Sequence, residues 1–446
     1  MKKSNIIRLF NRFLLGIVIS ALIFGISPYI QATASTVRYA KPDGLTSGTC
    51  DSWANACGLQ YALSLAVSGE EIWVMQGTYR PTIGINRFMT FQLKTGVGLY
   101  GGFLGDEIDR SQRDKNPSVT ILSGDIGVAG DDSDNAYHVV TGSGTDSSAV
   151  LNGFKITEGN ANGPDDQRGA GMINQAGSPS LTNVVFENNS ASLSGGGMYN
   201  LNNSPHLVNV TFRNNFSGSF AGGMGNAYSD TILVNVTFID NSANVRGGGM
   251  LNYYCNPSLT NVSFVDNWSV TGAGIYNDHS DSTLINVTFT GNLAEIQGGA
   301  LYNATSNPMI HNSILWDNSP DQVYNDTSNP TITYSDLEGE CPLGSTCTNI
   351  LNVDPIFVDP NINDLHLGAS SPVIDAGDNT KVPADMLDLD GDGNTSEPLP
   401  YDLAGYPRFL NNPDIADTGN GSPPIVDMGA YEFVQTLEVY LPLIQR

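Results

Sequence analysis

The sequence predicts an all-β fold, a single-stranded parallel β-helix with about 26 residues per coil. The first observation is the motif N-V-x-F-x-x-N, which recurs through the middle of the chain. Its phenylalanines, and the leucine that replaces the last of them, are spaced 26, 26, 26, 25 and 26 residues apart. They stand at Phe186, Phe212, Phe238, Phe264, Phe289 and Leu315. Self-similarity at a fixed period of this length indicates a repeat architecture.

A second motif recurs in the same register. A cluster of small residues precedes an apolar residue, and an asparagine follows two places later. The apolar positions are Met172, Met198, Met224, Met250, Ile275 and Leu301. The asparagines are Asn174, Asn200, Asn226, Asn252, Asn277 and Asn303. Both motifs share the single slip to 25 residues, so the repeat is structural rather than compositional.

The apolar runs within each repeat are short and rich in Val, Thr and Phe, and Gly or Asn interrupts them. This pattern is typical of short strands rather than helices. One repeat therefore forms one coil, and neighbouring coils pair through parallel ladders about 4.8 Å apart. We expect the apolar residues to point inward and the asparagine rows to hydrogen-bond along the stack, where they cap bends with buried backbone groups.

The chain divides into five predicted segments. A basic start, an apolar run over residues 13–26 and an A-x-A site at 32–34 predict a secretory signal peptide, with a membrane anchor as the alternative. The segments are 1–34 for the signal peptide, 35–150 for an N-terminal cap with irregular first coils, 151–340 for the regular repeats, 341–434 for C-terminal coils and a loop-rich cap, and 435–446 for a tail.

Composition narrows the function classes. Among 446 residues there are 19 Lys and Arg against 45 Asp and Glu, for a formal net charge of −26. This excess of acid disfavours nucleic acid and anionic lipid as partners, because both require clustered basic residues. We expect a monomer without a membrane span after signal cleavage, located outside the cell or on its surface.

The five cysteines are consistent with an exported protein. Cys50 and Cys57 are close in sequence, as are Cys341 and Cys347, and we predict a disulfide within each pair. Cys255 is left over and is interpreted as an inert small residue.

The repeats resemble those of a known family. Phe289–Asn292 and Gly298–Leu301 carry an F-x-x-N and G-G-A-[ILV] pair, which resembles the repeats of chlamydial polymorphic outer membrane proteins. The resemblance covers about residues 150–320 and implies a surface β-helix that acts in adhesion.

Segments outside the repeats resemble a broader group, the secreted bacterial right-handed β-helix repeat proteins of the choice-of-anchor type. The segments are 52–56, 71–74, 77–79, 99–103, 119–125, 371–377 and 426–433. This resemblance implies a right-handed coil and export, and it implies little about chemistry.

One acidic loop has the spacing of a calcium site. Oxygen ligands at alternate positions, followed by glycine, match the start of a calcium-binding loop. The candidate ligands are Asp388, Asp390, Asp392, Asn394 and Glu397. A structural Ca²⁺ ion is one interpretation and an ordinary acidic turn is the other; no other cofactor is expected.

The repeat register also brings two acids together. Asp240 and Asp266 occupy the same place in neighbouring repeats, and Arg213 is the nearest base in register. Carboxylates about 5 Å apart could share a proton, bind a cation or cleave a glycosidic bond. Catalysis is one interpretation of these three residues, and a solvated acidic surface is the other.

Aromatic residues recur at positions expected to face outward. They are Tyr199, Phe216, Trp268, Tyr276 and Tyr302. Stacked rings on a long face could bind sugars, although ordinary surface packing would produce the same pattern.

We therefore expect a secreted or cell-surface protein that binds a polysaccharide or another surface ligand without catalysis. The alternatives are a polysaccharide lyase or glycoside hydrolase that acts on an extracellular polymer, and a purely structural exoprotein.

Overall fold

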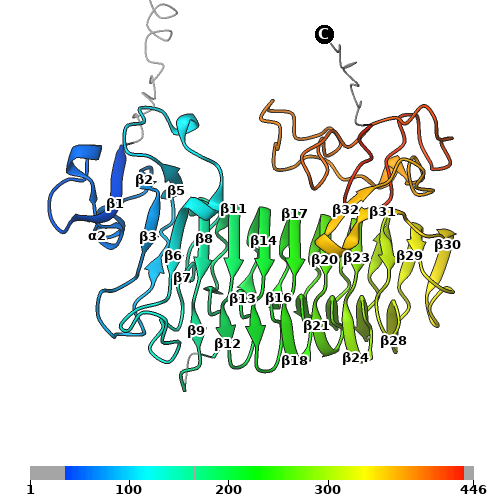
Figure 1. The fold of residues 1–446 in the computed structure, drawn as a ribbon, viewed down its shortest axis with the longest axis horizontal. Helices are drawn as coiled ribbons and strands as arrows, with labels where there is room; N and C mark the ends of the chain where they lie inside the picture. The colour runs from blue at the N-terminus through cyan, green and yellow to red at the C-terminus, as the bar shows by residue number, and fades with distance from the viewer. Residues whose placement is uncertain (1–35, 165–166, 436–446) are drawn as a thin grey trace, which may run out of the picture. The chain divides into compact units, whose positions relative to one another are not determined.

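The computed structural model describes residues 36–164 and 167–435. The predicted signal peptide and nearly all of the predicted tail lie outside these residues. The described chain forms a right-handed parallel β-helix (Figure 1), in which three parallel sheets run along the stack of coils. The predicted fold is therefore confirmed. No helix among the described residues is long and apolar enough to span a membrane.

Sheet A is the longest sheet and carries the phenylalanine motif. Each repeat pairs with the next in register, so that Phe212 lies opposite Phe186 on one side and Phe238 on the other. Its strands are β1 (Val37–Leu45), β2 (Glu71–Met75), β3 (Gly77–Tyr79), β5 (Gly98–Phe103), β6 (Thr120–Ser123), β8 (Val150–Thr157), β11 (Ser180–Glu187), β14 (His206–Arg213), β17 (Ile232–Ile239), β20 (Ser258–Val265), β23 (Thr283–Thr290), β26 (Met309–His311), β27 (Ile314–Trp316), β29 (Thr331–Leu337) and β30 (Thr346–Leu351).

Sheets B and C complete each coil. Sheet B consists of β4 (Phe91–Gln92), β7 (Val140–Thr141), β10 (Met172–Gln175), β13 (Met198–Asn203), β16 (Met224–Ser229), β19 (Met250–Tyr253), β22 (Ile275–Asp278), β25 (Leu301–Ala304) and β28 (Val323–Asp326). Sheet C consists of β9 (Asn160–Ala161), β12 (Ser190–Ala191), β15 (Phe216–Ser217), β18 (Ser242–Arg246), β21 (Trp268–Thr271) and β24 (Leu293–Gln297). The remaining elements are α2 (Leu59–Leu65), the antiparallel pair β31 (Phe357–Asp359) and β32 (Asp364–Leu367), and the short 3-10 turns η1 (Trp53–Asn55), η2 (Arg110–Gln112), η3 (Pro117–Val119), η4 (Pro360–Ile362) and η5 (Asn379–Lys381).

The core is a column of stacked side chains. The rings of Phe186 and Phe212 are nearly parallel, with centroids 4.9 Å apart, and the spacing from Phe238 to Phe264 is 4.6 Å. This distance matches the spacing of parallel strands, because each ring sits at the same register on successive coils. Burial of this column, together with the equally buried leucine, valine and methionine rows, stabilises the repeats.

Asparagines in a left-handed backbone conformation explain how sheet A buries its motif. Leu181 and Val184 both point inward although they are three residues apart, which a regular strand would not allow. Asn183 lies between them with a φ of 53°. Asparagine tolerates this conformation at low cost. In each repeat it shifts the alternation of inward and outward side chains by one residue, so that the apolar residues on both sides of it point inward.

Two further asparagine rows form the predicted ladders inside the coils. The Nδ2 of Asn215 donates to Oδ1 of Asn241 at 3.0 Å, and the Nδ2 of Asn200 donates to Oδ1 of Asn226 at 2.9 Å. Residues of both rows are fully buried. Because amides both donate and accept, identical residues can pair along the stack, and in the row that starts at Asn174 the Oδ1 of that first residue is buried without a partner.

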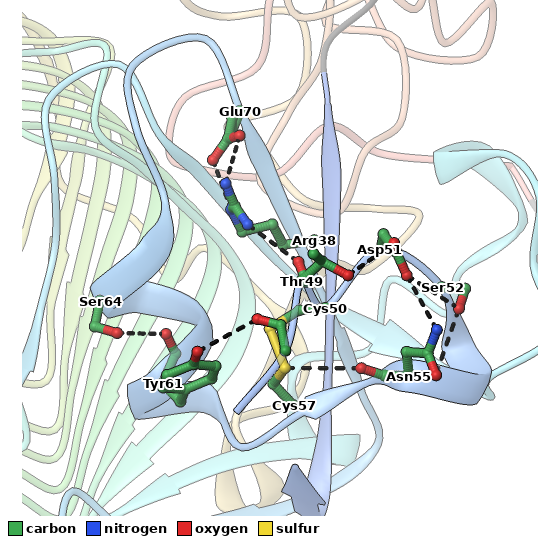
Figure 2. Close-up of a disulfide and its surroundings, with 11 residues drawn as sticks. Arg38, Thr49, Cys50, Asp51, Ser52, Asn55, Cys57, Tyr61, Ser64 and Glu70 are labelled. Atoms are coloured by element: carbon green, nitrogen blue, oxygen red, sulfur yellow. Dashed lines mark hydrogen bonds and ion pairs between the residues drawn. A yellow bond between two sulfur atoms is a disulfide. The ribbon is translucent and has the colours of Figure 1, made fainter. Parts of the chain in front are cut away.

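Both predicted disulfides are present, Cys50–Cys57 and Cys341–Cys347. The first lies in the N-terminal part, where Arg38 forms a bidentate ion pair with Glu70, with both N–O distances at 2.7 Å (Figure 2).

Cys255 is free and buried, and burial raises its pKa to about 11. A thiol with so high a pKa is unreactive at neutral pH, in line with the interpretation of Cys255 as inert.

The loop-rich C-terminal region folds back onto the side of sheet A, above β17, β20 and β23 in Figure 1. The left-handed asparagines of the repeats hold it there. Asn261 donates to the carbonyl oxygen of Tyr401 at 2.7 Å, and Asn286 donates to that of Asp427 at 3.1 Å. The predicted cap is thus a lateral cover on the coils, since its contacts join residues about 140 positions apart.

This cover is built around a buried group of acids. The guanidinium of Arg408 lies 3.2 Å from Glu432, and both side chains are fully buried. Asp427 is 1% exposed and accepts hydrogen bonds from the backbone of Asp375 and Phe433. Burial raises the pKa of Asp427 to about 7, and it also raises the pKa of Glu432. The single positive charge of Arg408 therefore cannot balance the charges of both Asp427 and Glu432 if both acids are ionised.

We expect the protein to lose stability as the pH rises from about 4 to 7. Burial also raises the pKa of Asp336 in β29 to about 7. An acid whose folded-state pKa is raised binds more protons when folded, so its contribution is complete below its unfolded pKa and is lost as the pH rises through its folded pKa. Each such acid adds a slope of up to about 1.4 kcal/mol per pH unit in this window.

Melting temperatures measured at unit pH steps from 4 to 8 check this expectation. Asp336→Asn is the informative variant, because only one carboxylate oxygen of Asp336 accepts a hydrogen bond, from Val353, while the other is buried and unpartnered. The variant should melt higher than the parent at pH 8 and show a shallower pH dependence. A melting temperature that rises from pH 5 to 8 would contradict the proposed role of these buried acids.

Candidate functional site

A groove on the outside of the coils is the leading candidate site. It lies where sheet C turns into sheet B and has a volume of about 470 Å³. It is lined by Arg168, Leu193, Ser194, Tyr199, Leu201, Phe220, Asn226, Ala227, Tyr228, Arg246, Leu251, Tyr253 and Asp278. Most of these side chains are aromatic or aliphatic, and the few polar groups lie among them, which is the usual chemistry of a ligand pocket.

A single glycine creates the space. Gly225 in β16 pairs with Tyr199 in β13 and with Leu251 in β19, so it stands in a row whose neighbouring members carry large side chains. A Cβ atom at this position would lie 2.7 Å from Oγ of Ser194 and 3.0 Å from Cδ2 of Tyr199. Because one coil lacks its outward side chain, the row is interrupted and a hollow remains.

Exposed aromatic rings border the groove. Tyr228 is 52% exposed, and its ring stacks on that of Tyr254 with centroids 5.7 Å apart. The ring of Tyr254 stacks in turn on that of His279 at 4.5 Å. Tyr228, Tyr254 and His279 all have a φ of 52°, which is an unfavourable backbone conformation for bulky residues. The same place in the repeat also has a positive φ on other coils, 55° at Asn202 and 49° at Thr305, so this conformation is a feature of the repeat.

Two arginines flank the groove. Arg168, Ser194, Phe220 and Arg246 occupy the same register on successive coils, so the arginines stand about 14 Å apart. The guanidinium of Arg168 lies 5.4 Å from the ring centroid of Tyr199, and that of Arg246 lies 4.8 Å from that of Tyr276. No carboxylate of the described residues forms an ion pair with either arginine, so their remaining N–H groups can serve a ligand.

The predicted aromatic residues do not form one site. Tyr199, Tyr276 and Tyr302 share a row of sheet B, but only Tyr199 lines the groove. Tyr276 is only 5% exposed because Arg246 and the stacked ring of Tyr302 cover it. Phe216 and Trp268 belong to sheet C. The sequence reasoning missed Tyr228, Tyr254 and His279, although their spacing of 26 and then 25 residues follows the repeat.

The acidic pair lies elsewhere, after the sheet A strands. Asp240 and Asp266 follow β17 and β20, and Arg213 ends β14 on the preceding coil. All three side chains are exposed. Burial raises the pKa of Asp240 while Arg213 lowers it; burial and the charges of Asp240 and Asp317 raise the pKa of Asp266. The Asp266 carboxylate lies against Gly291 of the next coil, and a Cβ atom added to Gly291 would lie 2.1 Å from Oδ1 of Asp266. None of the three lines the groove.

The predicted calcium loop brings its acids together. Ligand atoms of Asp388, Asp390 and Asp392 lie within 4.8 Å of one another, and so do those of Asp385, Asp390 and Glu397. Asn394 donates to the carboxylate of Glu397. Burial and the neighbouring acids raise the pKa of Glu397. Asp385 was missed from the sequence because it precedes the alternating acids by three positions.

A comparison with protein families agrees with the repeat geometry. The Chlamydia polymorphic membrane protein repeat matches residues 286–304, a segment that runs from β23 through β24 to the end of β25. The chain is a β-helix repeat protein with polymorphic-membrane-protein-like repeats. The match covers part of one coil of this β-helix repeat protein.

Solved structures with similarity to this β-helix repeat protein include three lyases. Pectate lyase Pel9A is 14% identical, with a TM-score of 0.46 over 89% of this chain and 96% of that one. A rhamnogalacturonan lyase is 10% identical, with a TM-score of 0.41 over 73% and 91%. A mannuronic acid specific lyase from human gut microbiota is 12% identical, with a TM-score of 0.29 over 70% and 78%. No curated protein matches the sequence.

Proposed function

We propose that this protein binds a glycan outside the cell or on its surface, and that the groove at Gly225 is the binding site. The supporting observation is a hollow bordered by the exposed rings of Tyr228 and Tyr253 and flanked by two arginines. Aromatic rings contact the apolar faces of sugars, and guanidinium groups donate paired hydrogen bonds to carboxylate or sulfate groups. The preferred ligand is therefore a glycan that carries acidic groups.

Two features support a location outside the cell. The two disulfides require an oxidising compartment to persist. The repeat resembles one described for a membrane protein of Chlamydia. The predicted signal peptide agrees with this proposal.

Binding without catalysis is the better-supported function, because the groove and the acidic row are separate. Among the described residues, one carboxylate lines the groove, that of Asp278, which already contacts His279 at 2.7 Å. The proposed catalytic residues Arg213, Asp240 and Asp266 do not line it. A lyase or hydrolase would require an acid and a base on either side of the bound sugar.

Size-exclusion chromatography with neutral and acidic polysaccharides tests the proposal. We expect the protein to co-migrate with an acidic polymer whose length does not change. Shortening of the polymer would overturn the proposal and direct attention to Asp240, Asp266 and Arg213. Failure to bind any polymer of the panel would also overturn it and favour a purely structural role.

We expect Tyr253→Ala to weaken glycan binding by about tenfold, since it removes one stacking ring. Phe216→Ala is the matched control, because Phe216 is 39% exposed and Tyr253 is 38% exposed, but Phe216 lies on sheet C outside the groove. Isothermal titration with the polymer selected by chromatography measures both. Equal loss in the two variants would place the ligand on a broad aromatic face instead of in the groove.

A further inference from the structure

The loop between residues 385 and 397 in the C-terminal region has a closed neck. The backbone N–H of Asp385 donates to the carbonyl oxygen of Glu397 at 2.8 Å, and that of Leu399 donates to Pro383 at 2.8 Å. Ala384 and Pro398 form an antiparallel bridge beside them. These backbone hydrogen bonds place Asp385 and Glu397 opposite each other at the two ends of the loop.

Two carboxylate oxygens at this neck are buried without a hydrogen-bond partner. Asp385 is fully buried; its Oδ2 accepts from the backbone N–H of Leu389 at 2.7 Å, but its Oδ1 has no partner among the described residues. Glu397 is half-buried, and its Oε1 atom is also buried without a hydrogen-bond partner among the described residues. Leaving a buried carboxylate oxygen unpaired is costly, so this arrangement calls for a positive group between them.

The distances suit one cation. Ligand oxygens of Asp385, Asp390 and Glu397 all lie within 4.8 Å of one another. Ca²⁺ binds oxygens at about 2.3–2.6 Å, so two ligands of the same ion are at most about 5 Å apart. Described residues offer no arginine or lysine in ion-pair contact with these acids.

We propose that Asp385, Asp390 and Glu397 bind one Ca²⁺ ion that ties the loop to its neck. The alternating acids Asp388 and Asp392 have no buried oxygen without a partner, and their oxygens accept hydrogen bonds from the backbone of Gly393 and Asn394 at 3.0 and 2.7 Å. Asp390 also accepts one, from the backbone of Asp392 at 3.2 Å. Asp388 and Asp392 shape the turn that brings Asp390 to the ion. The proposed ligand set therefore keeps Asp390 and Glu397 from the sequence-based prediction and adds Asp385, whereas Asp388, Asp392 and Asn394 are no longer ligands.

The ion also fixes a wall of a second groove. Leu389 is anchored by its bond to Asp385 and lines a groove of about 570 Å³ between the C-terminal region and sheet A. Tyr401 and Tyr431 line the same groove opposite Thr211 and Thr237 of the coils. Binding of Ca²⁺ at the neck thus stabilises the side of the C-terminal region that faces the repeats.

Isothermal titration of the purified full chain with CaCl₂ tests the proposal. Wild-type protein should bind one Ca²⁺ per chain with a Kd of roughly 10⁻⁵ to 10⁻³ M. Terbium luminescence, quenched by added Ca²⁺, provides a second readout at the same site. Melting temperature should rise by a few degrees on changing from EDTA to saturating Ca²⁺, since the ion binds only the folded loop.

Variants locate the ion. Asp385→Asn and Glu397→Gln should each weaken Ca²⁺ binding at least tenfold, whereas Asp392→Asn, a matched change in the same loop, should alter it less than threefold. If Asp385→Asn does not fold because the residue is buried, Glu397→Gln tests the same site by itself. Absence of binding by the wild type up to 10 mM Ca²⁺ would overturn the proposal. Loss of binding in Asp392→Asn with retention in Glu397→Gln would also overturn it, because the ion would then sit among Asp388, Asp390 and Asp392.

Discussion

Replacing Asn241 by aspartate should lower the free energy of unfolding by about 3–5 kcal/mol. The Asn241 amide makes four hydrogen bonds in the core. Its Nδ2 donates to the carbonyl oxygen of Phe212 at 2.9 Å and to Oδ1 of Asn267 at 3.0 Å. Its Oδ1 accepts from the backbone and side-chain amides of Asn215 at 3.1 and 3.0 Å. A carboxylate of the same shape keeps the acceptor bonds and loses both donors.

The cost is large because the site has no access to water. Asn241 is fully buried, so an ionised aspartate would face two acceptor oxygens at hydrogen-bond distance without a proton or solvent between them. The side chain would escape by taking up a proton, which raises its pKa. The loss should therefore grow with pH, because the protonated form retains one donor.

Asn209→Asp is the matched control. Asn209 is exposed, has a φ of 53°, and donates one hydrogen bond of 3.3 Å to Asn183. Aspartate tolerates the same backbone conformation, so the cost should stay under about 1 kcal/mol. Urea unfolding followed by tryptophan fluorescence and by circular dichroism measures both variants. Equal midpoints for the two would show that the buried ladder contributes nothing beyond an exposed amide.

Filling the groove should abolish glycan binding while the coils stay folded. Gly225→Leu restores the outward side chain that Leu251 provides on the next coil, so the strand pairing is unaffected. The nearest atom to the new Cβ is the hydroxyl oxygen of Ser194, which can rotate away. We expect affinity for the acidic polymer to fall at least about a hundredfold, which corresponds to about 2.7 kcal/mol.

The melting temperature of Gly225→Leu shows whether a loss of polymer binding comes from the filled groove or from unfolding. Ala227→Phe fills the same groove from β16 and serves if Gly225→Leu does not fold. A Gly225→Leu protein that melts like the parent and binds the polymer with parental affinity would show that the ligand does not use this groove. Calcium binding by the same variant should be unchanged, since Gly225 lies on the coils and not in the C-terminal loop.

The repeat could be predicted because, in a β-helix, a fixed spacing along the chain becomes a fixed neighbour in space. A residue such as Phe212 is paired with Phe186 and Phe238 by backbone ladders alone. Both buried asparagine rows follow from the same register. The disulfides were predictable for a related reason: each joins cysteines only 7 or 6 residues apart, so little of the fold is needed to bring them together.

The candidate sites were less predictable, because their properties depend on neighbours outside the motif. Register placed Tyr276 correctly in an outward row, but Arg246 and Tyr302 cover its ring. The groove arises from the missing side chain of Gly225, whereas a motif search looks for residues that are present. Asp385 joins the predicted acids through the closure of a neck, a contact that no spacing rule for metal loops includes.

The sequence by itself determined the coil, its period, its inward residues and its two disulfides, because these depend on interactions that recur at every step of the repeat. The tertiary structure alone decided where the C-terminal region lies, since the contacts of Asn261 with Tyr401 and of Asn286 with Asp427 occur once each and span about 140 residues. It also decided which outward rings stay exposed. Periodic local contacts leave a signal in the sequence, whereas single long-range contacts and the absence of a side chain do not.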